Sequence, residues 1–221
     1  AAINTLGVLY IVENGNTVNS LEDLKGKTVY STGKGTTPEY ALNYLLTSNG
    51  IDPQKDLTIE YKAESTEVAA VLASTPDAIG VLPEPFVTVA KSKNENLRDA
   101  ISFGDEWKKI NGEELVTGVL IVRNEFLENN QGAFETFLSE YKASTEFTKR
   151  SPDAVAELVG KYEIVPAPVA KKAIPKSNIT FIAGDDMKAN LGAYLQILFD
   201  QDPKSVGGKL PGEDFYFMNQ K

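Results

Sequence analysis

The sequence lacks cysteine and histidine entirely among its 221 residues. Without cysteine there can be no disulfide bond, no thiolate metal site and no cysteine nucleophile. Without histidine there can be no Ser-His-Asp triad, and histidine acid–base chemistry and most zinc sites are removed as well. Carboxylate, lysine and tyrosine chemistry stays open, so these absences disfavour an enzyme without ruling one out.

Basic residues are also scarce. The chain has 31 Asp and Glu against 22 Lys and Arg, which gives a formal net charge of −9. Because a protein neutralises phosphates with clustered Lys and Arg, this balance argues against a nucleic-acid partner. Long apolar runs are missing too, and none approaches the roughly 20 residues of a membrane-spanning helix.

The chain opens with Ala1-Ala2-Ile3, without an initiating methionine or a signal peptide. We therefore expect a processed chain or a fragment of a longer one. The absence of cysteine is compatible with export but does not demonstrate it. With 42% apolar and 24% charged residues, the composition is that of a globular protein of one to two domains.

The first half of the chain alternates short β-branched runs with helical patterns. This alternation predicts a parallel sheet with crossover helices. The expected strands are Leu6–Val12, Thr28–Ser31, Leu57–Tyr61 and Ala78–Leu82. The expected helical segments are a single turn at Ser20–Leu24, a helix from Pro38 to about Ser48, a helix at Ser65–Leu72, and a helix or turn at Thr88–Lys93.

The second half is mostly helical. One further strand is expected at Val116–Val122, followed by helices at Ala133–Lys149, Pro152–Val159 and Asp186–Phe199. A helical half with one or two strands needs a partner sheet, which favours missing N-terminal sequence.

The loop Gly33–Thr37 (GKGTT) is the first candidate site. It precedes a helix, so its free N–H groups and the helix dipole could hold an anion or a polar group. It matches neither the P-loop pattern nor the dinucleotide pattern GxGxxG. The alternative interpretation is a flexible connection with Thr36 or Thr37 as the N-cap of the helix.

Glu84, between Pro83 and Pro85, is the second candidate. The two prolines fix the backbone and favour extended predecessors. Glu84 is therefore expected at the carboxyl end of a parallel strand, where open α/β sheets bind their ligands. There it could accept hydrogen bonds from an amine, an amide or a hydroxyl group. The alternative is a solvated carboxylate in a rigid turn.

The aromatic residues and one charged stretch are more readily explained by the fold than by a binding site. Tyr10, Tyr40, Phe86 and Trp107 could line a pocket, but aromatic residues more often pack in a core. The stretch Lys91–Arg98 (KSKNENLR) is expected to be a solvated face.

Several stretches, taken in order, resemble the solute-binding proteins of ABC importers, and within them the nitrate, sulfonate, taurine and thiamine-precursor group. They are SLEDLKGKTVYSTGKGTTPEYALNYLLTSNGI, a segment ending in PDAIGVLPEPF, and LVTGVLIVRNEFLENN. The ending GGKLPGEDFYF resembles Gram-positive members. The resemblance covers nearly the whole chain. It implies an α/β fold of the type II periplasmic-binding-protein class, with two lobes and a hinge.

The resemblance also implies the domain boundaries. Residues 17–115 would form lobe two, a continuous α/β unit. Residues 1–16 and 116–221 would form the remaining part of lobe one with the C-terminal helices. Lobe one is expected to be incomplete, because family members carry further residues before the strand Leu6–Val12. The strands Leu6–Val12 and Val116–Val122 would cross beside the hinge.

In that family, a Gly-Thr loop at a helix N-terminus and an acidic residue at a strand end contact the ligand. The matching positions give a set of ligand-binding candidates, to which Thr117 on the second crossing strand is added: Gly35, Thr36, Thr37, Glu84, Pro85 and Thr117. No catalytic residue, metal ligand or cofactor is expected.

The implied function is that of a monomeric bacterial solute-binding protein outside the cytoplasm, in the periplasm or anchored at the cell surface as a lipoprotein. Its lobes would close around a small polar organic molecule, such as a sulfonate, an amino compound or a pyrimidine-like compound, and deliver it to a membrane permease. One alternative is a ligand-sensing regulatory domain of the same fold. Another is a pyrimidine-synthesising enzyme of this fold, but its chemistry depends on histidine.

Overall fold

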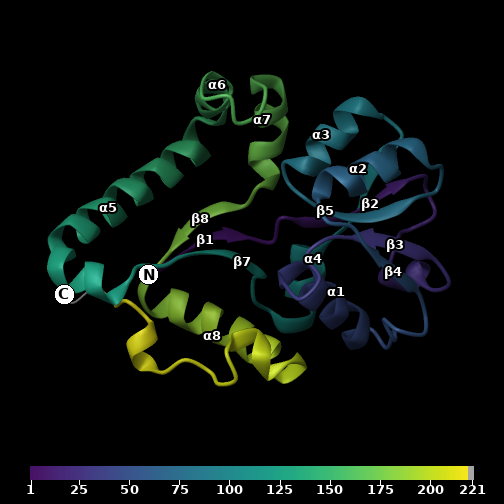
Figure 1. The fold of residues 1–221 in the computed structure, drawn as a ribbon. Coiled ribbons are helices and arrows are strands. Elements are labelled where there is room, and N and C mark those ends of the chain that lie inside the picture. Colours follow the sequence, from purple (N-terminus) through teal and green to yellow (C-terminus); the bar gives the residue numbers. More distant parts are fainter. Residues whose placement is uncertain (219–221) are drawn as a thin grey trace.

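The computed structural model describes residues 1–218, in which two β-sheets are joined by crossing segments of the chain (Figure 1). The strands are β1 (Ala2–Leu6), β2 (Leu9–Asn14), β3 (Thr28–Ser31), β4 (Thr58–Tyr61), β5 (Ile79–Pro83), β6 (Leu97–Ser102), β7 (Val116–Leu120) and β8 (Ile179–Ile182). The helices are α1 (Thr37–Ser48), α2 (Ser65–Ser74), α3 (Phe86–Lys93), α4 (Phe103–Asn111), α5 (Asn124–Arg150), α6 (Pro152–Lys161), α7 (Ala167–Ala173) and α8 (Gly184–Gln201). Short 3-10 turns are η1 (Leu21–Leu24), η2 (Ile174–Lys176), η3 (Pro203–Val206) and η4 (Glu213–Phe215).

The first half forms a five-stranded sheet in the order β4-β3-β5-β2-β6. β3 pairs in parallel with both β4 and β5, as the alternation of strands and helices predicts. The sheet is mixed, however, because β2 runs antiparallel to β5 and β6. Side chains alternate across it: Ile11 packs with the core residues of α1 and α4, whereas Val12 packs with those of α2 and α3. Both faces are therefore covered by helices, which gives the α/β fold.

Strands β7 and β8 of the second half pair with β1, from the start of the chain, in the antiparallel three-stranded sheet β7-β1-β8. Helix α8 packs on this sheet through Met187 and Leu191, and the long helix α5 lies against β8. Helices α6 and α7 pair with each other and reach back towards α3 (Figure 1). Across residues 1–218, none of the helices combines the length and the apolar character that a membrane span needs.

The single strand expected at Leu6–Val12 is wrong. The structure breaks it at Gly7-Val8 into β1 and β2, which belong to different sheets. A Cβ on Gly7 would lie 2.7 Å from the Gly104 Cα, so the backbones of the crossing segment and of α4 approach closely. Residues 9–14 pair with the five-stranded sheet. The division into lobes at residues 17–115 stays a prediction.

We expect Gly7→Ala to destabilise the protein, because its Cβ would collide with backbone that has no flexible end to move aside. Overpacking of this kind costs about 1–3 kcal/mol. The matched control is Gly104→Ala, whose Cβ would meet its nearest neighbour at an ordinary 3.6 Å. Chemical denaturation should show a lower free energy of unfolding for Gly7→Ala alone; equal effects of the two variants would contradict the crossing geometry.

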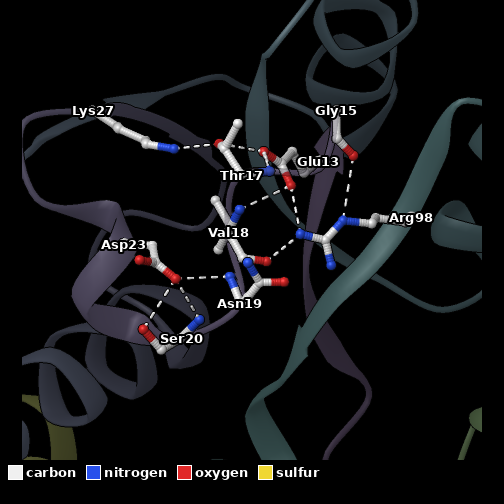
Figure 2. Close-up of polar contacts among 9 residues, drawn as sticks. All are labelled: Glu13, Gly15, Thr17, Val18, Asn19, Ser20, Asp23, Lys27 and Arg98. Atoms are coloured by element: carbon white, nitrogen blue, oxygen red, sulfur yellow. Dashed lines mark hydrogen bonds and ion pairs between the residues drawn. The ribbon is translucent and has the colours of Figure 1, made fainter.

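A buried ion pair fixes the far end of β2 (Figure 2). Glu13 is fully buried, and its carboxylate receives the Arg98 guanidinium at 2.8 Å. The same carboxylate accepts hydrogen bonds from the Thr17 N–H at 2.8 Å, the Thr17 hydroxyl at 2.6 Å and the Val18 N–H at 3.2 Å. Arg98 also donates to the carbonyls of Gly15 and Val18. The expectation of a solvated face at Lys91–Arg98 is therefore wrong at Arg98, because this side chain neutralises a carboxylate in the core.

The next turn continues the same polar network. The Asp23 carboxylate accepts the N–H groups of Asn19 and Ser20, each at 2.9 Å (Figure 2). These bonds satisfy amides at the start of η1 and confirm the single helical turn predicted from Ser20 and Asp23. The chain therefore leaves β2 through a turn that two carboxylates, Glu13 and Asp23, hold by hydrogen bonds.

We expect Arg98→Ala to lower the free energy of unfolding by about 3 kcal/mol at neutral pH, because it leaves the Glu13 carboxylate buried without its cation. Burial alone would raise the pKa of Glu13, but the bonds from Thr17, Val18 and Arg98 hold that pKa below its ordinary value. Because the pKa of Glu13 is lower in the folded than in the unfolded protein, its charged form stabilises the fold at any pH above the unfolded pKa. This stabilisation is lost as the pH falls through the lowered pKa of the folded state. The difference in the free energy of unfolding between wild type and Arg98→Ala should therefore become smaller in acid.

The control is Lys109→Ala, which breaks an exposed pair with Glu106 and should change stability by less than about 1 kcal/mol. Thermal or urea unfolding from pH 7 down to about pH 2, below the lowered pKa of Glu13, measures both variants. A pH-independent gap for Arg98→Ala would show that the loss comes from packing and not from the charge pair.

Candidate functional site: the carboxyl edge of the five-stranded sheet

The carboxyl ends of the parallel strands meet the segment that crosses between the sheets. β3 and β5 are neighbours and run in parallel, so both end at one edge. Leu9 pairs with Pro83, so β2 starts at this edge, directly after the crossing residues Gly7 and Val8. The loops that follow β3 and β5 therefore lie beside the junction with the three-stranded sheet, as expected for a ligand crevice in an open α/β sheet.

The Gly33–Thr37 loop turns from β3 into α1. The Thr36 hydroxyl donates to the Gly33 carbonyl at 2.6 Å, and the Gly35 N–H donates to the Glu39 carboxylate at 2.5 Å. Thr36 occupies the N-cap position, as one of the two interpretations predicted, but its side chain makes no capping bond. The amide offered to an anion is therefore held by the chain's own carboxylate, which the Tyr61 hydroxyl also contacts at 3.1 Å.

Thr37 connects this loop to the second half of the chain. Its hydroxyl oxygen accepts a bond from the Tyr194 hydroxyl of α8 at 3.2 Å. Tyr194 is buried against Trp107, with ring centroids 5.7 Å apart, and Trp107 lies 4.6 Å from the Tyr44 ring. Trp107 is thus a core residue, and Thr37 faces the junction between the two halves.

Glu84 is 8% exposed, so the alternative of a solvated carboxylate in a turn is wrong. Its side chain accepts the Thr88 N–H at 3.2 Å and the Thr88 hydroxyl at 3.0 Å, which satisfies the first turn of α3. Its own N–H donates to the Val8 carbonyl at 3.0 Å. Burial raises the pKa of Glu84 above its ordinary value, although the bonds from Thr88 and the charge of Lys176 oppose the rise.

Charged and polar side chains lie near Glu84, and one of them is Tyr10, which the sequence offered as a residue that could line a pocket. The Tyr10 hydroxyl donates to the Lys176 carbonyl at 3.1 Å. Asp99 pairs with Lys91 at 2.8 Å and also with Lys176. Burial, followed by the nearby charge of Glu84 and then of Asp99, raises the pKa of Tyr10 to about 12. Lys91 is thus another exception to the solvated face expected at Lys91–Arg98.

Thr117 and Pro85 take less direct positions. The Thr117 hydroxyl on β7 donates to the Leu6 carbonyl at 2.8 Å, at the start of the crossing segment. Pro85 precedes α3 as its N-cap residue. The structure therefore brings Glu84 and Thr117 to the same crossing segment, whereas Gly35 and Thr36 are exposed on the loop after the neighbouring strand. Whether these residues bind a ligand stays a prediction.

Within residues 1–218, no group of three or more Asp and Glu side chains is arranged to hold a metal ion. A cavity of about 970 Å³ lies elsewhere, between the end of β7, the start of α5 and the C-terminal segment. It contains none of the predicted site residues. The carboxyl edge thus offers backbone amides, hydroxyl groups and the buried Glu84 carboxylate, with the Asp99–Lys176 ion pair nearby.

Comparison with known proteins adds the family. No curated protein sequence matches the chain. A family model described as "NMT1/THI5 like" matches residues 2–155. An ABC transporter structure from Parabacteroides distasonis is similar with a TM-score of 0.77 and 23% identity, covering 100% of this chain and 74% of that chain. The structure of the periplasmic aliphatic sulphonate binding protein SsuA from Escherichia coli is similar with a TM-score of 0.74 and 18% identity. The match covers 97% of this chain and 69% of that chain.

The structure of the desulfurization enzyme DSZB is also similar, with a TM-score of 0.66 and 11% identity, covering 99% of this chain and 76% of that chain. At these identities the similarity concerns the fold, and it confirms the predicted type II periplasmic-binding-protein architecture. The family match spans well over half of the sequence. This chain therefore belongs to the NMT1/THI5-like family.

Proposed function

We propose that this chain is the solute-binding component of an ABC importer and binds a small polar organic molecule at the carboxyl edge of the five-stranded sheet. The observation that carries the proposal is the meeting of that edge with the crossing segment. The Gly33–Thr37 loop and Glu84 follow adjacent parallel strands, and each is bonded to a residue at the junction. Family membership and the binding-protein fold support this role.

The chemistry of the edge favours a solute with both a donor and an acidic or carbonyl group. Glu84 can accept a hydrogen bond from an amine or a ring N–H. The Gly35 amide at the start of α1 can donate to a sulfonate or a carbonyl, once the Glu39 carboxylate moves away. An aminosulfonate or an aminopyrimidine carries both functions.

Binding is favoured over catalysis, although the fold also serves a desulfurization enzyme. The chain has no cysteine and no histidine to act as a nucleophile or as a base of near-neutral pKa. Because SsuA is described as periplasmic, we extend a location outside the cytoplasm and delivery to a permease to this chain as parts of the proposal.

The half of the molecule around the three-stranded sheet displays an apolar face. Val119 is 41% exposed and Ile121 is 77% exposed at the end of β7, and Phe215 is 54% exposed in the C-terminal segment. The three side chains line one hollow, and a contiguous exposed apolar patch marks a surface that other polypeptide covers. The P. distasonis and SsuA structures extend beyond the part that this chain matches. We infer that the complete binding unit covers this face with further polypeptide, as predicted for an incomplete lobe one.

We expect Glu84→Gln to weaken binding of 2-aminoethanesulfonate about tenfold to a hundredfold, because a charge-assisted bond to the ammonium is worth roughly 1.5–3 kcal/mol. The free energy of unfolding at pH 7 should stay equal or rise. The raised pKa of Glu84 means that its charged form is disfavoured in the fold, and this cost is present once the pH exceeds that pKa. Titration calorimetry and thermal melting measure the two quantities.

Glu95→Gln is the matched control. Glu95 is an exposed carboxylate that follows the C-terminal end of α3, whereas Glu84 precedes the N-terminal end of that helix. It should change neither affinity nor melting temperature. If Glu84→Gln instead melts earlier and binds as well as wild type, the carboxylate serves only to cap α3.

We expect Glu39→Gln to raise the affinity for ethanesulfonate about fivefold, since it removes a negative charge next to the amide that would bind the sulfonate. A repulsion near the surface of about 1 kcal/mol corresponds to that factor. Calorimetry with ethanesulfonate and with 2-aminoethanesulfonate separates the two ends of the solute. A fall in affinity for both would place Glu39 itself among the ligand contacts.

A further inference from the structure

The corner between α6 and α7 displays large apolar side chains to water. Tyr162 is 70% exposed and Ile164 is 69% exposed. Among the large apolar side chains of residues 1–218, only Ile121 at the end of β7 is exposed to a greater extent. Leu158, one helical turn before Tyr162, is 42% exposed. These three residues, Leu158, Tyr162 and Ile164, form the α6–α7 tip, which lies away from β7 and α8 (Figure 1).

The backbone of the tip is held in one conformation. The Ile164 N–H donates to the Val159 carbonyl and the Glu163 N–H donates to the Gly160 carbonyl, both at 3.1 Å. This is the Schellman ending of a helix, with Glu163 in the left-handed region at a φ of 56°. An apolar residue in the place of Ile164 usually packs back onto the helix that has ended. Ile164 stays mostly exposed instead, so a fixed turn presents it to the surroundings.

Basic side chains gather around this apolar tip. The Lys161 ammonium lies 5.9 Å from the centre of the Tyr162 ring. The basic residues between the end of α5 and η2 are Lys149, Arg150, Lys161, Lys171, Lys172 and Lys176. The same stretch has three acidic residues, and one of them, Asp153, is paired with Lys171 at 2.9 Å. Residues 149–176 therefore have a formal charge of +3 within a chain whose net charge is −9.

We propose that the α6–α7 tip contacts the surface of an anionic lipid bilayer. A tyrosine has an apolar ring and a polar end, so Tyr162 is suited to the level of the lipid headgroups. Ile164 and Leu158 enter the boundary with the acyl chains, and the surrounding lysines face the lipid phosphates. A groove on another protein would cover the apolar residues equally well, but the local excess of basic residues favours an anionic surface. This contact goes beyond the proposed function and does not depend on any solute.

Flotation of the full chain with lipid vesicles tests the proposal. We expect binding to vesicles of equimolar phosphatidylglycerol and phosphatidylcholine, and much weaker binding to phosphatidylcholine alone. Combining Tyr162→Ser with Ile164→Ser should lower the partition coefficient about tenfold, because two apolar contacts are lost. Combining Lys161→Gln with Lys172→Gln should also lower it about tenfold, and added salt should weaken binding of the wild type.

Two control variants separate the tip from the rest of the surface. Ile121→Ser removes the most exposed apolar side chain of the other face, and Lys55→Gln removes an exposed lysine of the five-stranded half. Both should bind the phosphatidylglycerol vesicles as the wild type does. Circular dichroism melting confirms that each variant is folded.

Three outcomes would overturn the proposal. Absence of flotation with phosphatidylglycerol vesicles would leave a protein groove as the occupant of the tip. Unchanged binding after the Tyr162 and Ile164 substitutions, or its loss in Ile121→Ser, would assign lipid contact to the other face. Equal binding to both kinds of vesicle at every salt concentration would show that the basic residues do not select the surface.

Discussion

The arrangement of the two sheets depends on one place where backbone passes backbone. At Gly7 the chain leaves the centre of the three-stranded sheet, and two residues later it enters the five-stranded sheet between β5 and β6. This short passage runs against the start of α4 at Gly104, with no space for a side chain on Gly7. The junction, the carboxyl edge and the bonds of Glu84 and Thr117 to the crossing segment all follow from this close approach.

Carboxylates that are bonded within the chain recur around this framework. Glu13 holds Arg98 and the turn after β2, Glu84 holds the first turn of α3, and Glu39 holds the loop before α1. In each case an acidic side chain satisfies backbone amides or hydroxyl groups that would otherwise need water. A solute at the carboxyl edge must therefore compete with bonds that the protein already makes, so affinity depends on the difference between the two sets of bonds.

Local patterns predicted the part of the fold that is built from neighbouring elements. The succession from β3 to β5 through α1, β4 and α2 was visible because each element has its own periodicity and end signals. The break at Gly7 was not visible, because an apolar run on both sides reads as one strand. β6 was missed because its first residues follow a lysine-rich stretch, and the bond from Arg98 to Glu13 joins positions far apart in the sequence.

In the candidate site, too, the features that depend on neighbouring residues could be predicted, and those that depend on distant residues could not. Its location followed from the rule that ligands lie at the carboxyl ends of parallel strands, together with the glycines and prolines around Gly35 and Glu84. The burial of Glu84 could not be predicted, because it depends on how α3 and the crossing segment meet at the end of β5. The same is true of Lys176, which reaches the site from a 3-10 turn in the other half of the chain.

The position of β2 also has a consequence for the order of folding. β2 is the second strand in the chain, yet it lies between β5 and β6, which are made much later. During synthesis from the N-terminus, Ile11 and Val12 have no neighbouring strand until β5 has been made, and their second neighbour follows only with β6. Contacts between such distant segments form slowly. The five-stranded sheet therefore closes late, and until then the nascent chain carries an uncovered apolar strand that a chaperone could bind.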